Sequence, residues 1–268
     1  MTLAAKTLAT LRRWAGSSTE PRPFAEPGGL QAVLFDLDGT LLQVDMQRFI
    51  PDYVEGLAGV CADLAERRRF SEVVLKAIWG LLRNERGECS NQQLFHSAIE
   101  SHLAITPNLF NQRLQRYCVE GLPALAALIT PHPLVPRILQ ACFERGLKVV
   151  IATNPVFPRA LVEARLAWGG MGDFAFDLVT SYENTRYCKP HPGYFEDIVQ
   201  TLELAPERCL MVGNDTVHDL AAKQTGIATF LLDTWKVDRG GGFKPDFQGG
   251  HDELCRLVES LRPLDRPN

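Results

Sequence analysis

Two aspartates in the stretch "VLFDLDGTLL", residues 33–42, are the first residues in this chain whose types and spacing could do chemistry. Asp36 and Asp38 end an apolar run and stand directly before a glycine and a threonine. A pair of this kind often marks only a strand that has ended in a polar turn. The spacing of two also lets both carboxylates approach one point as the chain turns at Gly39.

Further polar residues follow later apolar runs of the chain, and they are Thr153, Asn154, Lys189, Asp215 and Asp219. If the apolar runs are parallel strands, their carboxyl ends share one edge of a sheet, where ligands bind. Three carboxylates meeting there would repel one another unless a positive group lay between them. Mg²⁺ is the cation that suits a few carboxylates together with a phosphate, so the pattern predicts a Mg²⁺ site.

The runs that position these residues are short and continuously apolar, which is typical of strands buried on both faces of a parallel sheet. Five such runs are present, at 32–36, 148–153, 176–181, 209–214 and 228–233.

Helical patterns alternate with these runs, near 133–145, 158–168, 192–203, 216–225 and 252–261. Strands that alternate with helices predict the α/β class, here a doubly wound parallel sheet.

Residues 43–130 interrupt the alternation, contain no strand-like run and predict an all-helical insert after the first strand. Ser90 and Gln93 form a capping-box pattern, and Thr106 before Pro107 is typical of a helix start. We expect this insert to lie above the carboxyl edge of the sheet. Its amphipathic stretch 70–82 predicts interior side chains rather than substrate contacts for Phe70, Trp79 and Leu81.

The chain therefore divides into an N-terminal segment 1–29, an α/β core made of 30–42 and 131–268, and the helical insert 43–130. The N-terminal segment begins with an acid-free amphipathic pattern and continues with a linker rich in proline and glycine. We interpret it as an extra amphipathic helix, with an organelle transit segment as the alternative.

Composition excludes several classes of partner. The chain has 268 residues, a net charge of -4 and interspersed acids and bases, so it has no basic face for nucleic acid or an anionic membrane. Its seven cysteines lack any C-x-x-C pair, which favours reduced thiols in a soluble, cytoplasmic protein. The histidines share no ligand spacing, so no zinc site is expected. The sequence leaves the oligomeric state open.

Four motifs, "FDLDGTLL", "IATN", "KP" and "VGNDTVHD", occur in the order and spacing of those of the haloacid dehalogenase-like (HAD) hydrolase superfamily, which the chain resembles from Ala32 to about Asp233. The resemblance implies a HAD-like core, with the helical insert in the place of the family's C1 cap. One departure lies in the fourth motif, where Asn214 separates Gly213 from the expected metal-binding Asp215.

The resemblance also implies the catalytic roles. Asp36 would attack phosphorus and form an aspartyl phosphate, and Asp38 would protonate the leaving alcohol and then activate water. Thr153 and Asn154 would bind the phosphoryl oxygens, and Lys189 would supply positive charge to the transition state.

The same resemblance implies the metal ligands. Asp36, the backbone carbonyl of Asp38 and Asp215 would hold Mg²⁺, and Asp219 would support the ion indirectly. The alternative for Asp219 is a favourable place at the positive end of its helix. Asn214 could instead reach the site.

These implications predict a Mg²⁺-dependent phosphatase that acts on a small phosphorylated metabolite. Dehalogenation is disfavoured, because haloacid dehalogenases lack an acid at the position of Asp38. The alternatives are a phosphomutase and a metal-binding regulatory module without turnover. Polar residues in the loop 180–188, among them Glu183, Asn184 and Arg186, could touch substrate or simply satisfy one another.

Overall fold

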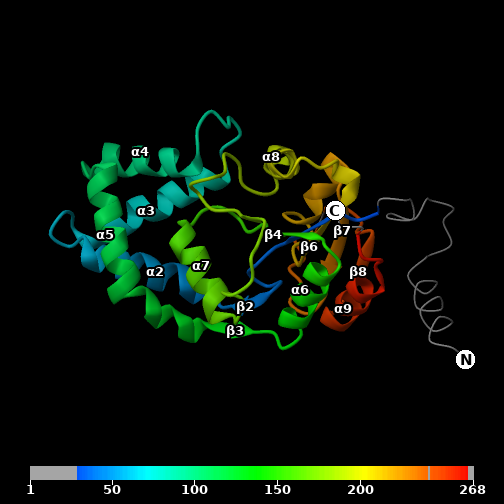
Figure 1. Ribbon diagram of the computed structural model, residues 1–268. Helices are drawn as coiled ribbons and strands as arrows, with labels where there is room; N and C mark the ends of the chain where they lie inside the picture. Colours follow the sequence, from blue (N-terminus) through cyan, green and yellow to red (C-terminus); the bar gives the residue numbers. More distant parts are fainter. Residues whose placement is uncertain (1–28, 241, 265–268) are drawn as a thin grey trace, which may run out of the picture.

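The computed structural model describes residues 29–240 and 242–264, so the predictions made for residues 1–28 lie outside the described residues. Its centre is a parallel six-stranded sheet with the order β5-β4-β1-β6-β7-β8 (Figure 1). The strands are β1 Ala32–Phe35, β4 Lys148–Ile151, β5 Leu178–Val179, β6 Cys209–Gly213, β7 Ala228–Leu232 and β8 Phe247–Gly249. The predicted α/β class with a parallel sheet is confirmed.

Both faces of the sheet are covered, which explains why its strands are apolar without alternation. On β1, Val33 and Phe35 belong to the larger core cluster, together with α6 Val135–Glu144 and α9 His251–Ser260. The other face belongs to a second cluster that contains Leu34 and α8 Pro192–Leu202.

Because the chain builds outward from β1 on both sides, β1 lies between β4 and β6. Where the order of the strands reverses in this way, a crevice opens at their carboxyl ends. The first and fourth motifs follow β1 and β6 and therefore end at this crevice.

Three short strands were not predicted. β8 adds an edge to the main sheet, and β2 Leu42–Val44 pairs antiparallel with β3 Ile129–Pro131. Each has only three residues and no continuous apolar run. The expectation that 43–130 lacks strand was thus wrong at both ends.

The helix predicted for 216–225 was wrong in its first half. The only helical residues there are the 3₁₀ helix η3, Leu220–Thr225. Oδ1 of Asp215 accepts the backbone N–H groups of Val217 and His218, each at 2.9 Å. These bonds fold the chain into a side-chain-stabilised turn where a regular helix would begin.

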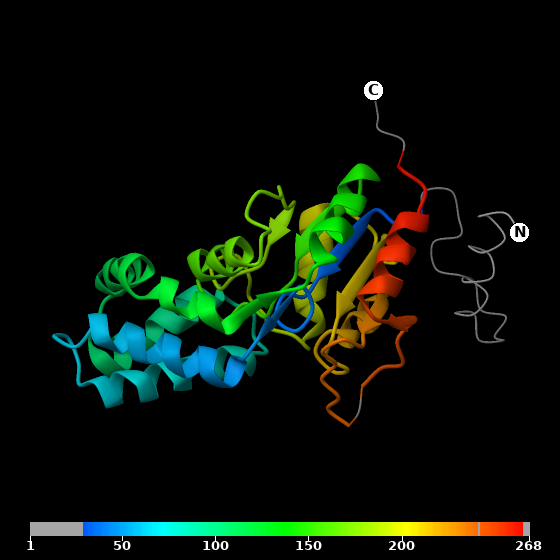
Figure 2. The same ribbon diagram turned by 90° about the horizontal axis from the view of Figure 1, so that it is seen from below.

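Between β2 and β3 lie four α-helices and a 3₁₀ helix, which form a separate group to one side of the sheet (Figure 2). They are α2 Met46–Val60, α3 Arg67–Leu82, α4 Asn91–Leu103, α5 Pro107–Glu120 and η1 Leu122–Leu128. Below, this stretch is called the helical insert. Both predicted caps are present, since Ser90 forms its capping box and Thr106 accepts the N–H of Leu109.

The interior of the insert includes Phe70 and Leu81, as expected. Trp79 was wrongly predicted as an interior residue and is 58% exposed. The buried stripe of α3 runs through positions 70, 74, 77, 78 and 81, and residue 79 lies beside it.

The insert also touches the core away from β2 and β3. The N–H of Asn91 donates to the Thr185 carbonyl at 2.9 Å, and the N–H of Gln92 donates to the Tyr182 carbonyl at 2.7 Å. The ring of Phe49 meets Phe157, which precedes α7 Arg159–Trp168. In the part of the chain that is described, no helix combines the length and apolar character needed to cross a bilayer.

Candidate active site

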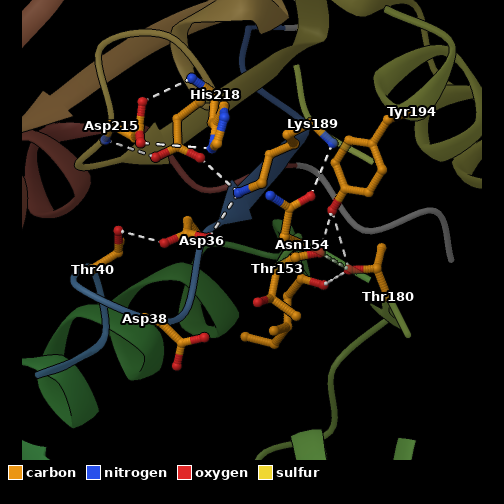
Figure 3. A network of polar contacts seen from close by, with 12 residues as sticks. Asp36, Asp38, Thr40, Thr153, Asn154, Thr180, Lys189, Tyr194, Asp215 and His218 are labelled. Carbon is orange, nitrogen blue, oxygen red and sulfur yellow. Dashed lines mark hydrogen bonds and ion pairs between the residues drawn. The ribbon is translucent and has the colours of Figure 1, made fainter. Parts of the chain in front are cut away.

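Asp36 lies one residue beyond β1, at the carboxyl edge of the sheet. It is 7% exposed, and both of its carboxylate oxygens are engaged. Oδ1 accepts from the Lys189 ammonium at 2.7 Å, and Oδ2 accepts from the Thr40 hydroxyl at 3.1 Å (Figure 3). These contacts fix the orientation of the carboxylate.

Lys189 is the cation at the centre of the site. Its side chain is 2% exposed. Besides Asp36, its ammonium donates to Oδ1 of Asp219 at 2.6 Å. Burial alone would lower the pKa of Lys189, but the charges of Asp219 and Asp36 more than offset this effect and raise the pKa. The lysine is therefore charged and shared between two acids.

Asp219 is bonded to the backbone of the fourth motif. Its Oδ2 accepts the backbone N–H of Asp215 at 2.9 Å, so it joins Lys189 to that loop. Burial raises the pKa of Asp219 to about 6, and the Lys189 ammonium opposes the rise. A side chain at Gly213 would place its Cβ 2.2 Å from Cγ of Asp219, which explains the glycine. Its contact with Lys189 makes Asp219 more than a favourable charge at a helix start.

Asp38 takes a different direction from Asp36. Its carboxylate is turned away from the contact between Asp36 and Lys189 (Figure 3). Oδ2 forms an ion pair with Nη1 of Arg165 on α7. Burial raises the pKa of Asp38, Arg165 opposes the rise and the nearby charge of Asp36 adds to it. The expectation that both carboxylates approach one point was therefore wrong, because Arg165 draws Asp38 aside.

Asp215 follows β6 and is 6% exposed. Its Oδ2 accepts from Nε of Arg239 at 2.6 Å, and that arginine belongs to the loop after β7. Burial would raise the pKa of Asp215, but the backbone N–H groups of His218 and Val217, together with Arg239, lower it. Asp215 is therefore ionised and paired with Arg239.

Thr153 and Asn154 follow β4, as predicted. The carbonyl of Thr153 accepts from the Thr180 hydroxyl at 2.8 Å and from the Tyr194 hydroxyl at 2.9 Å (Figure 3). Oδ1 of Asn154 accepts the backbone N–H of Lys189 at 3.0 Å. The asparagine thus joins the second motif to the third, and the hydroxyls fix the backbone of the second.

Asn214 lies against the turn of the first motif at Gly39. Its Nδ2 donates to the carbonyl of Trp235 at 2.6 Å. Gly39 has a φ of +86°, and a Cβ there would lie 2.2 Å from Nδ2 of Asn214. The glycine therefore allows both the turn after the two aspartates and the close approach of the fourth motif.

In the loop 180–188, the side chains of Glu183, Asn184 and Arg186 all have partners within the protein. Glu183 accepts the N–H of Arg159 through both oxygens at 3.0 Å, which caps the start of α7. Oδ1 of Asn184 accepts the Ser181 N–H at 2.9 Å, and Arg186 forms an ion pair with Asp197 at 2.6 Å. These side chains position the loop from which Lys189 emerges.

Three side chains were missed by sequence reasoning, namely Arg165, Arg239 and Tyr194. Arg165 and Arg239 pair with predicted site residues from distant points of the chain, and neither lies in a motif. Tyr194 was a visible aromatic near the start of a predicted helix, yet nothing local links it to Thr153.

The four acids pair with three cations, Lys189, Arg165 and Arg239. Within residues 29–240 and 242–264, no three acid, histidine or cysteine side chains converge as a ready-made metal site. The donor chemistry nevertheless fits Mg²⁺. This ion uses one or two carboxylates with waters and substrate oxygens and does not need an all-protein cage. Asp36 and Asp215 supply hard oxygens at the carboxyl ends of the adjacent strands β1 and β6.

Comparison with known proteins decides the family. A profile of the haloacid dehalogenase-like hydrolases matches residues 30–226, most of the chain. The chain belongs to this family. Among curated relatives, this HAD-like hydrolase is 25% identical over 240 residues to pyrophosphatase PpaX of Bacillus cereus (strain Q1), covering 88% of the chain and 99% of the relative. The PpaX of Bacillus anthracis (strain A0248) is 26% identical over 241 residues with the same coverage.

Solved structures show the same fold. A HAD phosphatase from Thermococcus onnurineus aligns with a TM-score of 0.53 at 20% identity, covering 88% of this HAD-like hydrolase and all of the other chain. L-2-haloacid dehalogenase from Xanthobacter autotrophicus aligns with a TM-score of 0.51 at 20% identity, covering 87% and 99%. Phosphatases and dehalogenases share this architecture, so the choice between them depends on the site residues.

Proposed function

We propose that this HAD-like hydrolase is a Mg²⁺-dependent phosphatase that acts on small phosphorylated metabolites through an aspartyl phosphate on Asp36. The observation that carries the proposal is the contact of Lys189 with both Asp36, at 2.7 Å, and Asp219, at 2.6 Å. It places a permanently charged cation against a carboxylate that is oriented by Thr40 at the carboxyl edge of the sheet.

In the first step, a carboxylate oxygen of Asp36 attacks phosphorus, and the bond to the leaving oxygen breaks. Asp38 donates its proton to that oxygen, which departs as an alcohol. In the second step, Asp38 takes a proton from water, the water oxygen attacks phosphorus, and Asp36 is released with inorganic phosphate. The raised pKa of Asp38 suits a group that must begin protonated.

Lys189 and Asn154 handle the transferred group. The ammonium of Lys189 faces charge on the phosphoryl oxygens, and Asn154 holds the lysine backbone at 3.0 Å. Mg²⁺ held by Asp36, the Asp38 carbonyl and Asp215 would supply further positive charge to the phosphoryl group. The proposal keeps Asp219 as the residue that anchors Lys189.

The presence of Asp38 favours phosphate over halide chemistry, because a halide leaves without a proton. The names of the relatives support phosphate as well, since those from both Bacillus species are called pyrophosphatases. We propose that the helical insert acts as the cap that closes over the substrate and excludes water.

The test is phosphate release by the purified chain with Mg²⁺ from pyrophosphate and a panel of small phosphate monoesters. Asp36→Asn should lower kcat by about 1000-fold or more, because it removes the nucleophile while preserving its shape. The matched control is Asp45→Asn, which makes the same change at the N-cap of α2 in the insert. A folded Asp36→Asn protein that retained wild-type turnover would sink the proposal, and interconversion of sugar phosphates faster than phosphate release would favour a mutase.

A further inference from the structure

Arg165 is among the largest fully buried side chains in the described part of the protein. Its guanidinium is permanently charged, and a buried charge is costly unless a partner of opposite sign lies beside it. It lies in the interior of α7, outside all four motifs. A residue of this kind needs an explanation that local structure does not give.

The contacts of Arg165 point to one acid. Nη1 forms the ion pair with Oδ2 of Asp38, and Nε reaches the Leu161 carbonyl at 3.4 Å. The guanidinium also lies over two rings, that of Phe157 at 5.1 Å and that of Phe49 at 5.7 Å. Apolar rings on its faces leave Asp38 as the group that receives its charge.

The atoms left over are as informative as the contacts. Oδ1 of Asp38 and Nη2 of Arg165 are buried, and neither has a hydrogen-bond partner among the described residues. Buried polar atoms without partners are rare, and those that persist often serve function. The ion pair thus fixes one oxygen of Asp38 and leaves the other for a further partner.

We propose that Arg165 is a positioning residue for Asp38, which holds Oδ2 so that Oδ1 faces the leaving oxygen of the substrate. This inference rests on the proposed phosphatase function. In the first step the proton on Oδ1 moves to the leaving oxygen, which keeps the electron pair of the broken bond to phosphorus. Oδ1 then accepts a proton from the attacking water, and the pair with Arg165 is retained throughout.

Phe49 gives the arrangement a second consequence, because it belongs to α2 of the helical insert. Arg165 touches Asp38 on one side and this insert residue on another. The position of Asp38 is therefore coupled to the packing of the insert against the core.

The experiment compares two substrates that differ in their need for a proton. The leaving group of 4-nitrophenyl phosphate is a stable anion, whereas that of ethyl phosphate must be protonated as it leaves. Arg165→Met should lower kcat for ethyl phosphate by about 100-fold or more, within the range that general acid catalysis contributes. For 4-nitrophenyl phosphate the loss should stay below about 10-fold. Asp38→Asn should show the same selectivity, and adding Arg165→Met to it should not increase the selectivity.

Arg165→Lys keeps a charge and is the second variant if Arg165→Met does not fold. Where both variants fold, Arg165→Lys should recover part of the kcat for ethyl phosphate that Arg165→Met loses. Where only Arg165→Lys folds, it should still lose more kcat on ethyl phosphate than on 4-nitrophenyl phosphate. Equal losses on the two esters in a folded variant would overturn the inference alone, since a purely structural role predicts that result. A wild-type chain that releases phosphate neither from these esters nor from any member of the panel above would overturn the proposed function and this inference together.

Discussion

The two buried cations of the site are treated very differently. Lys189 is bonded to two acids, and its backbone is bonded to Asn154. Arg165 has one acid, two aromatic neighbours and a nitrogen without a partner among the described residues. We infer that the region for the transferred phosphoryl group is assembled in advance, whereas the region for the leaving group is completed by substrate.

Of the variants that test this difference between Lys189 and Arg165, Lys189→Met should have the largest effect on kcat/KM. It removes charge that meets every phosphate ester, so kcat/KM should fall by about 1000-fold on both ethyl and 4-nitrophenyl phosphate. It should also lower the free energy of unfolding by about 3 to 5 kcal/mol, because two buried acids lose their partner. Steady-state kinetics and urea titration measure both. A loss confined to ethyl phosphate would break the contrast with Arg165.

A smaller effect, on the pH dependence of stability, is expected from His251, which contacts the first motif. His251 on α9 contacts the Thr40 carbonyl through Nε2 at 2.9 Å, and burial lowers its pKa from 6.5 to about 4. Because the unfolded chain takes up this proton first, the folded protein should lose about 3 kcal/mol of stability as the pH falls from 7 to 4.

His251→Gln should remove that part of the pH dependence, and the difference between the urea-denaturation profiles of the two proteins isolates it. His102→Gln is the matched control, because it makes the same change at an exposed histidine in the last turn of α4. Parallel profiles for wild type and His251→Gln would show that the first motif is not supported by a neutral histidine.

The smallest effect concerns the Asp215 pair, which is the most exposed ion pair among those of the candidate site. The side chain of Arg239 is 46% exposed, and an ion pair of this kind contributes only about 0.2 to 1 kcal/mol. Arg239→Ala should therefore tighten Mg²⁺ binding by about 2-fold to 5-fold, measured by calorimetry or by Mn²⁺ competition.

Lys244→Ala is the control, because it removes the same charge from an exposed position in the same loop. Equal affinities for the two variants would mean that Arg239 does not compete with the metal. Weaker binding in Arg239→Ala would mean that it supports the site.

The residues whose place could be predicted are those that their neighbours in the sequence identify. Asp36 directly follows an apolar run and precedes a turn, so its place at the sheet edge follows from period and order. Lys189 lies eight residues beyond the run 176–181, and its place in the third motif identified it. Arg165 occupies an ordinary helical position, and only the tertiary fold brings it 127 positions back along the chain to Asp38. The predictions of a buried Trp79 and of a helix starting at residue 216 were wrong for a related reason. Packing of α3 sets the exposure of Trp79, and the turn formed by the Asp215 side chain delays the start of η3.

The division into three domains and the assigned roles of the site residues stay predictions. What the fold adds to them is the pairing of each acid. Repulsion among acids suggested a metal from the sequence, and the structure answers part of that repulsion with Lys189, Arg165 and Arg239.

The contact between α4 and the core has a consequence for how substrate enters. The N–H groups of Asn91 and Gln92 belong to the first turn of α4, where helical partners are missing, and core carbonyls accept them at 2.9 and 2.7 Å. If the insert swings outward, these N–H groups must form hydrogen bonds with water molecules instead. Opening and wetting of this seam are then a single event, and each closure over a phosphate ester would have to expel the same water again.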